Sequence, residues 1–299
     1  MSDRPLVLLL ADPESTVGRM VSDRFDVVRG PDARVRAVVG TGMSRVPADL
    51  ISALPALGLI ALNGVGYDGV DVAAARARGV AVTTTPDVLT DDVADQAIAL
   101  MLAVLRRTAA NDRAVREGRW SVPLARRVSG RTVGIFGLGR IGRAIAMRAA
   151  PFAGEIVYAS RRVYADVPWR HLPNITALAE ASDVLILAAA ATRDTAHVVD
   201  AGVLRALGAE GVLVNIARGS LVDEAALVEA LRDGTIAGAG LDVFADEPRV
   251  PEALTGMEHV VLAPHQASAT VETRAAMAEL VVANLEALFA GRALVTPLG

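Results

Sequence analysis

The 299-residue chain is 53% hydrophobic and 21% charged, with a formal net charge of −4. This balance predicts a globular protein with material for about two domains and excludes a largely disordered chain. The chain has no cysteine, and its 30 basic residues are all arginine. These absences exclude a disulfide scaffold, a thiolate nucleophile or metal site, a lysine Schiff base and a Walker phosphate-binding loop.

The sequence predicts a cytoplasmic protein that binds neither membranes nor nucleic acids. The apolar run at residues 6–11 is too short for a signal peptide. The longest apolar stretches, 97–105 and 184–191, are about half as long as a membrane span. Mild acidity argues against a nucleic-acid partner, and we interpret the arginine-rich stretch 106–148 as a solvated helix face.

Short apolar runs alternate with helix-like segments in the first third of the chain. Helical patterns such as Val70–Arg78 lie between the runs, so the first third predicts a parallel sheet. A longer helix is predicted to start near Thr90. Its residues 97–105 are apolar on every side, which is typical of a helix buried between domains or subunits. The predicted strands are 6–11, 35–40, 57–62 and 80–83.

Strand and helix patterns resume after an arginine-rich passage, and the chain closes with a helix over Thr270–Phe289. We therefore predict an α/β fold of two Rossmann-like, doubly wound parallel-sheet domains, with the active site in the cleft between them. One domain comprises residues 1–95 and 270–299, and the other residues 96–269. The strands predicted in the second domain are 132–136, 156–159, 184–188, 212–216, 237–241 and 260–262.

A glycine-rich turn follows the first strand of the second domain and opens a helix. Its three glycines permit a tight turn, close approach of the backbone to a pyrophosphate, and close helix–strand packing. Because a strand precedes the motif and a helix follows it, the turn predicts a dinucleotide site. Its predicted contacts are Gly137, Leu138, Gly139, Arg140, Ile141 and Gly142.

The next strand ends in Ser160, Arg161 and Arg162, where an NAD site usually carries an acidic residue for the ribose hydroxyls. Two guanidinium groups and a hydroxyl suit a 2′-phosphate, so the sequence predicts a preference for NADP(H), with NAD(H) as the alternative. The competing interpretation is a pair of solvated surface arginines.

Three polar segments follow three later strands. They carry Arg218, Glu247 and His265, and in a parallel sheet the carboxyl ends of the strands share one edge. We therefore expect these three side chains to converge beside the cofactor. A guanidinium pairs with a planar carboxylate, and a carboxylate beside an imidazole favours its protonated form, which suits a general acid.

The motifs GLGRIG, NIARGSLVDE, GLDVFADEP and APHQASAT occur in an order that resembles the D-isomer-specific 2-hydroxyacid dehydrogenase family. NGVGYD and TPDVLTDDVAD extend the resemblance over nearly the whole chain. Within the family, TPDVLTDDVAD and the Ser-Arg-Arg strand end are most similar to NADPH-dependent glyoxylate/hydroxypyruvate reductases. The resemblance implies a substrate-binding domain, 1–95 with 270–299, and an NAD(P)-binding domain, 96–269.

The resemblance also implies roles for individual residues. Arg218 would hold the carboxylate and carbonyl oxygen of a 2-oxo acid, His265 would supply the proton during reduction, and Glu247 would orient the imidazole. The family needs no metal, and it implies a homodimer. Further expected contacts are the backbone N–H groups of Val65 and Gly66 for the substrate carboxylate, and Ile216, Ala217 and Asp242 for the cofactor.

Some assignments have alternatives. Asp242 is either a contact of the nicotinamide carboxamide or a cap at a strand end, and Trp120 either shapes a pocket or packs. Another D-2-hydroxyacid dehydrogenase, such as phosphoglycerate dehydrogenase, is the competing enzyme. A non-catalytic module that senses NAD(P) is the competing binding function. Which 2-oxo acid is physiological does not follow from the sequence, because one methylene of substrate changes binding by only about 1–3 kcal/mol.

Overall fold

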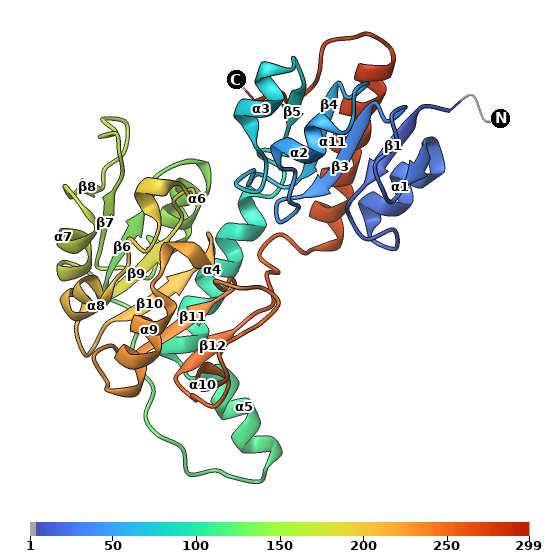
Figure 1. The fold of residues 1–299 in the computed structure, drawn as a ribbon. Helices are drawn as coiled ribbons and strands as arrows, with labels where there is room; N and C mark the ends of the chain where they lie inside the picture. The colour runs from blue at the N-terminus through green and yellow to red at the C-terminus, as the bar shows by residue number, and fades with distance from the viewer. Residues whose placement is uncertain (1–3, 299) are drawn as a thin grey trace. The chain divides into compact units, whose positions relative to one another are not determined.

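The computed structural model describes residues 4–298, which form two compact units (Figure 1). The first unit comprises the chain up to Leu89 together with the residues from Ser268 onward, and the second comprises Thr90–Ala267. The predicted boundary at residue 95 falls inside helix α4 (Thr90–Leu105), all of which belongs to the second unit. No helix within residues 4–298 combines the length and the apolar character needed to span a membrane.

The first unit is built on a parallel sheet. Within the described residues, its five strands lie in the order β2-β1-β3-β4-β5, and the strand order reverses between β1 and β3, as in a doubly wound fold. The strands are β1 (Leu6–Leu9), β2 (Asp26–Val28), β3 (Ala37–Thr41), β4 (Leu59–Asn63) and β5 (Ala81–Thr83).

Helices cover both faces of this sheet, and alternating side chains of its strands pack against the helices on one face or the other. Val7 and Val39 pack with α1 and α11, whereas Leu8 and Val38 pack with α2 and α3. Successive residues of a strand point to opposite faces, so a strand covered on both sides is a continuous apolar run. The helices are α1 (Thr16–Arg24), α2 (Ala48–Ser52), α3 (Val72–Ala77) and α11 (Val271–Phe289).

The second unit has a larger parallel sheet. Seven strands are present in the described chain, in the order β12-β11-β10-β9-β6-β7-β8, with the reversal between β6 and β9. The strands are β6 (Thr132–Phe136), β7 (Glu155–Ala159), β8 (Arg170–His171), β9 (Val184–Leu187), β10 (Val212–Asn215), β11 (Gly238–Leu241) and β12 (Val260–Leu262).

Helices also cover both faces of this sheet. One face carries α7 (Ile175–Glu180), α8 (Ala201–Leu207), α9 (Glu224–Arg232) and α10 (Glu252–Thr255), and the other carries α4 and α6 (Arg140–Ala149). The small residues of β11 let α4 approach closely, because a carbon added at Gly240 would lie 2.9 Å from Cβ of Leu100. Two short 3-10 turns complete the unit, η1 (Arg193–Thr195) and η2 (Gly219–Leu221).

Helix α5 (Thr108–Arg116) and the segment after it, residues 117–127, project from the second unit (Figure 1). We call α5 and this segment the arm. Trp120 is 83% exposed and Leu124 is 96% exposed. Trp120 therefore does not pack into the core of its own chain.

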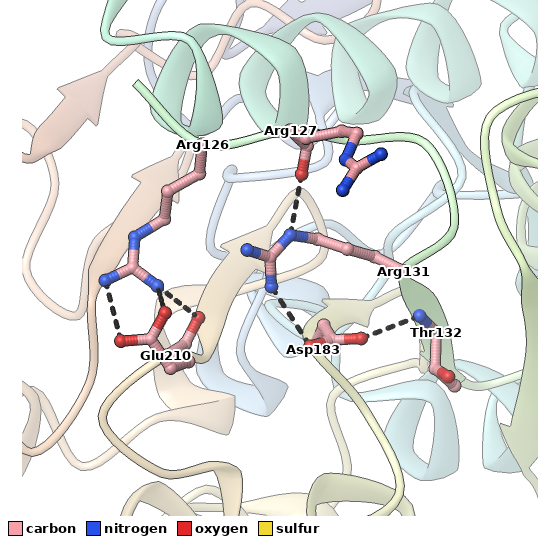
Figure 2. A network of polar contacts seen from close by, with 6 residues as sticks. All are labelled: Arg126, Arg127, Arg131, Thr132, Asp183 and Glu210. Atoms are coloured by element: carbon pink, nitrogen blue, oxygen red, sulfur yellow. Dashed lines mark hydrogen bonds and ion pairs between the residues drawn. The ribbon is translucent and has the colours of Figure 1, made fainter. Parts of the chain in front are cut away.

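A polar network ties the end of the arm to the sheet (Figure 2). The guanidinium of Arg126 binds both carboxylate oxygens of Glu210. Arg131 donates to Asp183 over 3.0 Å, and Asp183 also accepts the N–H of Thr132 at 2.8 Å. Thr132 begins β6, Asp183 directly precedes β9, and Glu210 lies two residues before β10. The network therefore lies at the amino ends of the strands, opposite the edge on which ligands bind in such sheets.

The predicted pair of doubly wound α/β sheets is confirmed. Each strand expected from the sequence is present, with its ends displaced by no more than two residues. The sequence did not indicate β2 and β8. Both are short edge strands with a single neighbour and no buried residue, so they lack the buried apolar run by which the other strands are recognised.

Candidate active site

The glycine turn joins β6 to α6, and each of its glycines meets a different steric requirement. Gly137 has a φ of 97°, a conformation in which side chains are strained. A carbon added at Gly142 would lie 2.0 Å from the carbonyl oxygen of Gly137, so only glycine allows this close helix–strand packing. A carbon added at Gly139 would meet nothing within 4 Å, which leaves open space at the start of α6.

This geometry fits a dinucleotide. An added side chain at Gly139 would fill the space that a pyrophosphate needs, and the N-terminus of α6 supplies N–H groups and a positive dipole end. Gly139 and Arg140 are exposed, whereas the side chain of Leu138 is buried in the core of the unit. The turn can therefore hold the phosphates of a nucleotide cofactor.

The end of β7 presents cations without a carboxylate. Ser160 follows the strand, and its Oγ donates to the carbonyl oxygen of Arg162 over 2.5 Å. Arg161 and Arg162 are exposed. Within residues 4–298, neither guanidinium makes a hydrogen bond or an ion pair. Two unpaired guanidinium groups beside a glycine turn suit an additional phosphate better than a bare ribose.

His265 and Glu247 form a hydrogen-bonded pair at the carboxyl edge of the same sheet. His265 Nδ1 donates to Glu247 Oε2 over 2.7 Å, and Glu247 Oε1 accepts the N–H of Phe244 at 3.0 Å. The side chain of His265 is 30% exposed, whereas that of Glu247 is only 14% exposed. The carboxylate thus fixes one ring nitrogen, and the partly exposed ring leaves Nε2 able to take part in a proton transfer.

Two opposing influences act on the ionisation of Glu247. Burial by itself raises the pKa of the carboxyl, but the hydrogen bonds from His265 and Phe244 and the positive charges of His265 and Arg218 outweigh it. The pKa of Glu247 therefore lies below its ordinary value, and the group is a carboxylate at neutral pH.

Asp242 braces the turn that carries His265. Its two carboxylate oxygens accept the N–H groups of Gln266 and Ala267 at 2.8 and 2.9 Å, and its carbonyl oxygen accepts the N–H of His265. The side chain is fully buried, and burial raises the pKa of Asp242 above its ordinary value, while the two backbone N–H groups oppose that rise. This is the geometry of a strand-end cap, and the expected contact with the nicotinamide stays a prediction.

Arg218 lies in a tightly packed loop after β10. Asn215 shapes this loop, because its Oδ1 accepts the N–H of Ala217 and its Nδ2 donates to the carbonyl oxygen of Arg218. A carbon added at Gly219 would lie 2.0 Å from the carbonyl carbon of Phe244. The loops after β10 and β11 therefore touch, and Arg218 comes close enough to Glu247 to lower the pKa of that carboxyl.

Strand order explains why three segments that are far apart in the sequence meet. Arg218, Glu247 and His265 follow β10, β11 and β12, which are neighbours in the sheet, so their loops share one edge. The sequence did not indicate Asn215 or Gly219 as parts of the site. A polar residue at the end of an otherwise apolar strand is the signal that marks Asn215, whereas only the fold shows the close approach at Gly219.

The predicted substrate contacts Val65 and Gly66 lie in the first unit, directly after β4. Val65 is exposed, and Gly66 is half-buried. Buried beside this loop are Asn63 Oδ1 and Thr85 Oγ1, and neither oxygen has a hydrogen-bond partner in the described structure. The loop thus lies beside two buried side-chain oxygens that still have hydrogen-bonding capacity.

Other histidines have structural surroundings. His171 Nε2 lies 3.2 Å from the carbonyl oxygen of Ser160, and His259 Nε2 lies 3.3 Å from that of Leu231. His197 is exposed. Across residues 4–298, no group of three or more His, Cys, Asp or Glu side chains is placed to hold a metal ion.

The amino-acid sequence is similar to those of known dehydrogenases and reductases. Residues 98–267 match the model of the NAD-binding domain of D-isomer specific 2-hydroxyacid dehydrogenases. Glyoxylate/hydroxypyruvate reductase A of Arabidopsis thaliana is 48% identical over 306 residues, which cover 97% of this chain and 98% of the relative. Hydroxyphenylpyruvate reductase of Plectranthus scutellarioides is 51% identical over 266 residues, or 88% and 85% of the two chains.

A solved structure is similar over both units. The NADPH-dependent glyoxylate/hydroxypyruvate reductase of Sinorhizobium meliloti, in complex with NADP and malonate, has a TM-score of 0.94 and 46% identity. The match covers 99% of this chain and 97% of that structure.

Proposed function

The chain belongs to the D-isomer specific 2-hydroxyacid dehydrogenase family of oxidoreductases, and from this premise we propose that it reduces small 2-oxo acids to D-2-hydroxy acids with NADPH. The proposed substrates are of the glyoxylate and hydroxypyruvate kind, because relatives at 48% and 46% identity over nearly the whole chain are named for them. The hydrogen bond between His265 and Glu247, beside the loop of Arg218, is the observation that carries the proposal.

Each of the three side chains has a distinct task in this reaction. Arg218 binds the carboxylate and the carbonyl oxygen of the 2-oxo acid and so orients and polarises the carbonyl. His265 donates its Nε2 proton to the carbonyl oxygen, and Glu247 holds the ring and stabilises its protonated form. The reduced nicotinamide, when bound, supplies a hydride to the carbonyl carbon. The product is the 2-hydroxy acid, and the imidazole regains a proton from solvent.

The cofactor rests on groups described above. The glycine turn at 137–142 holds the pyrophosphate at the start of α6, and Ser160, Arg161 and Arg162 bind the 2′-phosphate. We assign further cofactor contacts to Ile216, Ala217 and Asp242. The NADP bound to the Sinorhizobium meliloti relative supports the same nucleotide here, with NAD(H) as the weaker alternative.

The N–H groups of Val65 and Gly66 bind the second oxygen of the substrate carboxylate. The protein functions as a homodimer, and its exposed arm offers the apolar surface for a second copy. The cytoplasmic location stays a prediction from the sequence.

A spectrophotometric assay of NADPH oxidation tests the proposal. The panel contains glyoxylate, hydroxypyruvate, pyruvate, 3-phosphohydroxypyruvate and hydroxyphenylpyruvate, and the same panel is repeated with NADH. We expect the highest kcat/KM with glyoxylate or hydroxypyruvate, and a higher kcat/KM with NADPH than with NADH. The hydroxyphenylpyruvate reductase at 51% identity makes a larger side chain the second candidate, so hydroxyphenylpyruvate provides the decisive comparison.

Each alternative has its own result. Preference for 3-phosphohydroxypyruvate would indicate a phosphoglycerate dehydrogenase. Cofactor binding without turnover of any 2-oxo acid would indicate a non-catalytic sensing module. A higher kcat/KM with NADH would contradict the assigned role of Arg161 and Arg162 while leaving the reaction class intact.

A further inference from the structure

Residues 160–166, the first part of the loop between β7 and β8, carry two unpaired guanidinium groups and a single acidic residue. Arg161 and Arg162 are both exposed, and their guanidinium groups make no hydrogen bond or ion pair within the described chain. Asp166 lies four residues further on, with a side chain that is 66% exposed. A free carboxylate here would repel the phosphate that the arginines are expected to attract.

A residue of the cofactor helix neutralises this carboxylate. Arg143, in the first turns of α6, binds Asp166 with both Nη atoms, over 2.6 and 3.1 Å. The ring of Tyr164 stacks on the same guanidinium, whose Cζ lies 4.4 Å from the ring centroid. We call Arg143, Tyr164 and Asp166 the Arg143 cluster. It connects the middle of the loop to the helix that begins at the glycine turn.

The base of the loop is fixed independently. The hydroxyl of Tyr158, a fully buried residue of β7, accepts the N–H of Tyr164 over 2.9 Å. His171 on β8 packs edge-on against the ring of Tyr158, and its Nε2 hydrogen-bonds to the carbonyl oxygen of Ser160. The loop is therefore tied to both flanking strands as well as to α6.

These contacts matter because an exposed ion pair alone contributes little order. A solvated arginine–carboxylate pair contributes little to stability, since water competes for both charges. A bidentate pair that is also covered by an aromatic ring has one geometry rather than many. A loop already held in its binding geometry loses less conformational entropy when a ligand binds.

We propose that the Arg143 cluster is a positioning element for the 2′-phosphate of the cofactor. It masks the charge of Asp166 and holds the 160–166 loop so that Arg161 and Arg162 face a phosphate monoester. This role deepens the function proposed above, because it depends on the preference for NADPH. None of the three residues of the cluster has to touch the cofactor for the effect.

Tyr164→Ala is the informative substitution, because it removes the stacked ring and leaves every formal charge in place. Tyr164→Phe is the matched control, since it keeps the ring. Isothermal titration calorimetry of the full chain would measure two cofactor fragments, adenosine 2′,5′-bisphosphate and adenosine 5′-monophosphate, which differ only in the 2′-phosphate. We expect Tyr164→Ala to raise the Kd of the bisphosphate about three- to fivefold and to leave the Kd of the monophosphate unchanged.

Tyr164→Phe should bind both fragments as the unchanged protein does. Tyr158→Phe, which deletes the hydroxyl at the base of the loop, should raise only the Kd of the bisphosphate. The proposal is overturned if Tyr164→Ala weakens both fragments equally, or if it binds the bisphosphate as tightly as the unchanged protein.

The double variant Arg161→Ala/Arg162→Ala separates this test from the proposed function. We expect it to remove the preference of the protein for the bisphosphate. If the unchanged protein itself has no such preference, the proposed use of NADPH fails and the role of the cluster fails with it. If the double variant loses the preference and Tyr164→Ala keeps it, the cofactor assignment stands and only the cluster is refuted.

Discussion

His265 occupies a backbone conformation that few side chains adopt, with a φ of 53°. Such a conformation persists only where the surroundings stabilise it. Asp242 supplies this support, because its carbonyl oxygen accepts the N–H of His265 and its carboxylate accepts the two following N–H groups. The backbone that carries the ring is thus held in place, which suits the general acid proposed above, since a small displacement of the donor slows proton transfer.

His265→Asn should lower kcat by about 10²- to 10⁴-fold, because an amide cannot donate the proton, while the Kd for NADPH stays unchanged. Asparagine is the suitable replacement because it tolerates a positive φ better than alanine does. Steady-state kinetics and calorimetry would provide the two measurements. His197→Asn is the matched control, since His197 is exposed and has a φ of 50°. Undiminished turnover by the His265 variant would remove this residue from the mechanism.

Glu247→Gln should lower the free energy of unfolding at pH 7 by about 1–3 kcal/mol, because it replaces a partly buried carboxylate that accepts two hydrogen bonds. The pKa of Glu247 in the folded protein lies below the ordinary value of 4.5. Its stabilising contribution is therefore present above pH 4.5 and disappears as the pH falls through the folded-state value.

Urea unfolding at pH 7 and at a series of lower pH values would measure this dependence. The difference between the unchanged protein and Glu247→Gln should shrink as the pH falls. Glu180→Gln, at an exposed position, should show no difference at any pH. A difference that grows on acidification would contradict the assignment of Glu247 as the ionised partner.

At the scale of elements, two glycines of the β6–α6 turn are expected to have different roles. Gly142 is required by the packing of the protein itself, whereas Gly139 leaves space for a ligand. Gly142→Ala places a carbon against the carbonyl oxygen of Gly137 and should cost about 1–3 kcal/mol or more of stability. Gly139→Ala meets no protein atom, and its φ of −75° suits any residue, so it should change stability by less than about 0.5 kcal/mol.

The two variants should also differ in ligand binding. Gly139→Ala should raise the Kd for NADPH at least about tenfold, because the added methyl group occupies the space for the pyrophosphate. Thermal unfolding and calorimetry on the same samples would compare the two variants directly. A normal Kd for Gly139→Ala would mean that the pyrophosphate does not lie over the start of α6.

At the scale of the whole molecule, the arm exposes two large apolar side chains that a partner could cover. Trp120 and Leu124 lie within five residues of each other and are almost fully exposed. The network at Arg126 fixes the end of the arm to the sheet. A second copy of the chain would bury these side chains, in agreement with the proposed homodimer.

Leu124→Asp should raise the dimer dissociation constant at least about tenfold, because a charge would then have to be buried at the interface. Analytical ultracentrifugation would resolve dimers from chains of 31.0 kDa. Val271→Asp is the control, since Val271 is 84% exposed but lies outside the arm. If the unchanged protein is a monomer, or if both variants dissociate equally, the arm is not the dimer surface.

Much of the candidate site could be predicted because its signals are local. The glycine spacing, the missing carboxylate after β7 and the polar residues after three apolar strands are all visible along the chain. Asn215, Gly219 and the Arg143 cluster could not be predicted in this way. Their importance depends on contacts between segments that only the order of the strands brings together.

The sequence alone determined the two parallel sheets, the dinucleotide turn, and the residue types available for acid–base work and anion binding. Buried parallel strands are long apolar runs, and a turn that only glycine allows is visible as spacing, so both can be recognised without coordinates. Tertiary structure decided that Glu247 bonds to His265, that Asp242 braces the histidine turn, and that Arg143 neutralises Asp166. These pairings are set by sheet order and side-chain packing, which are not local properties of the chain.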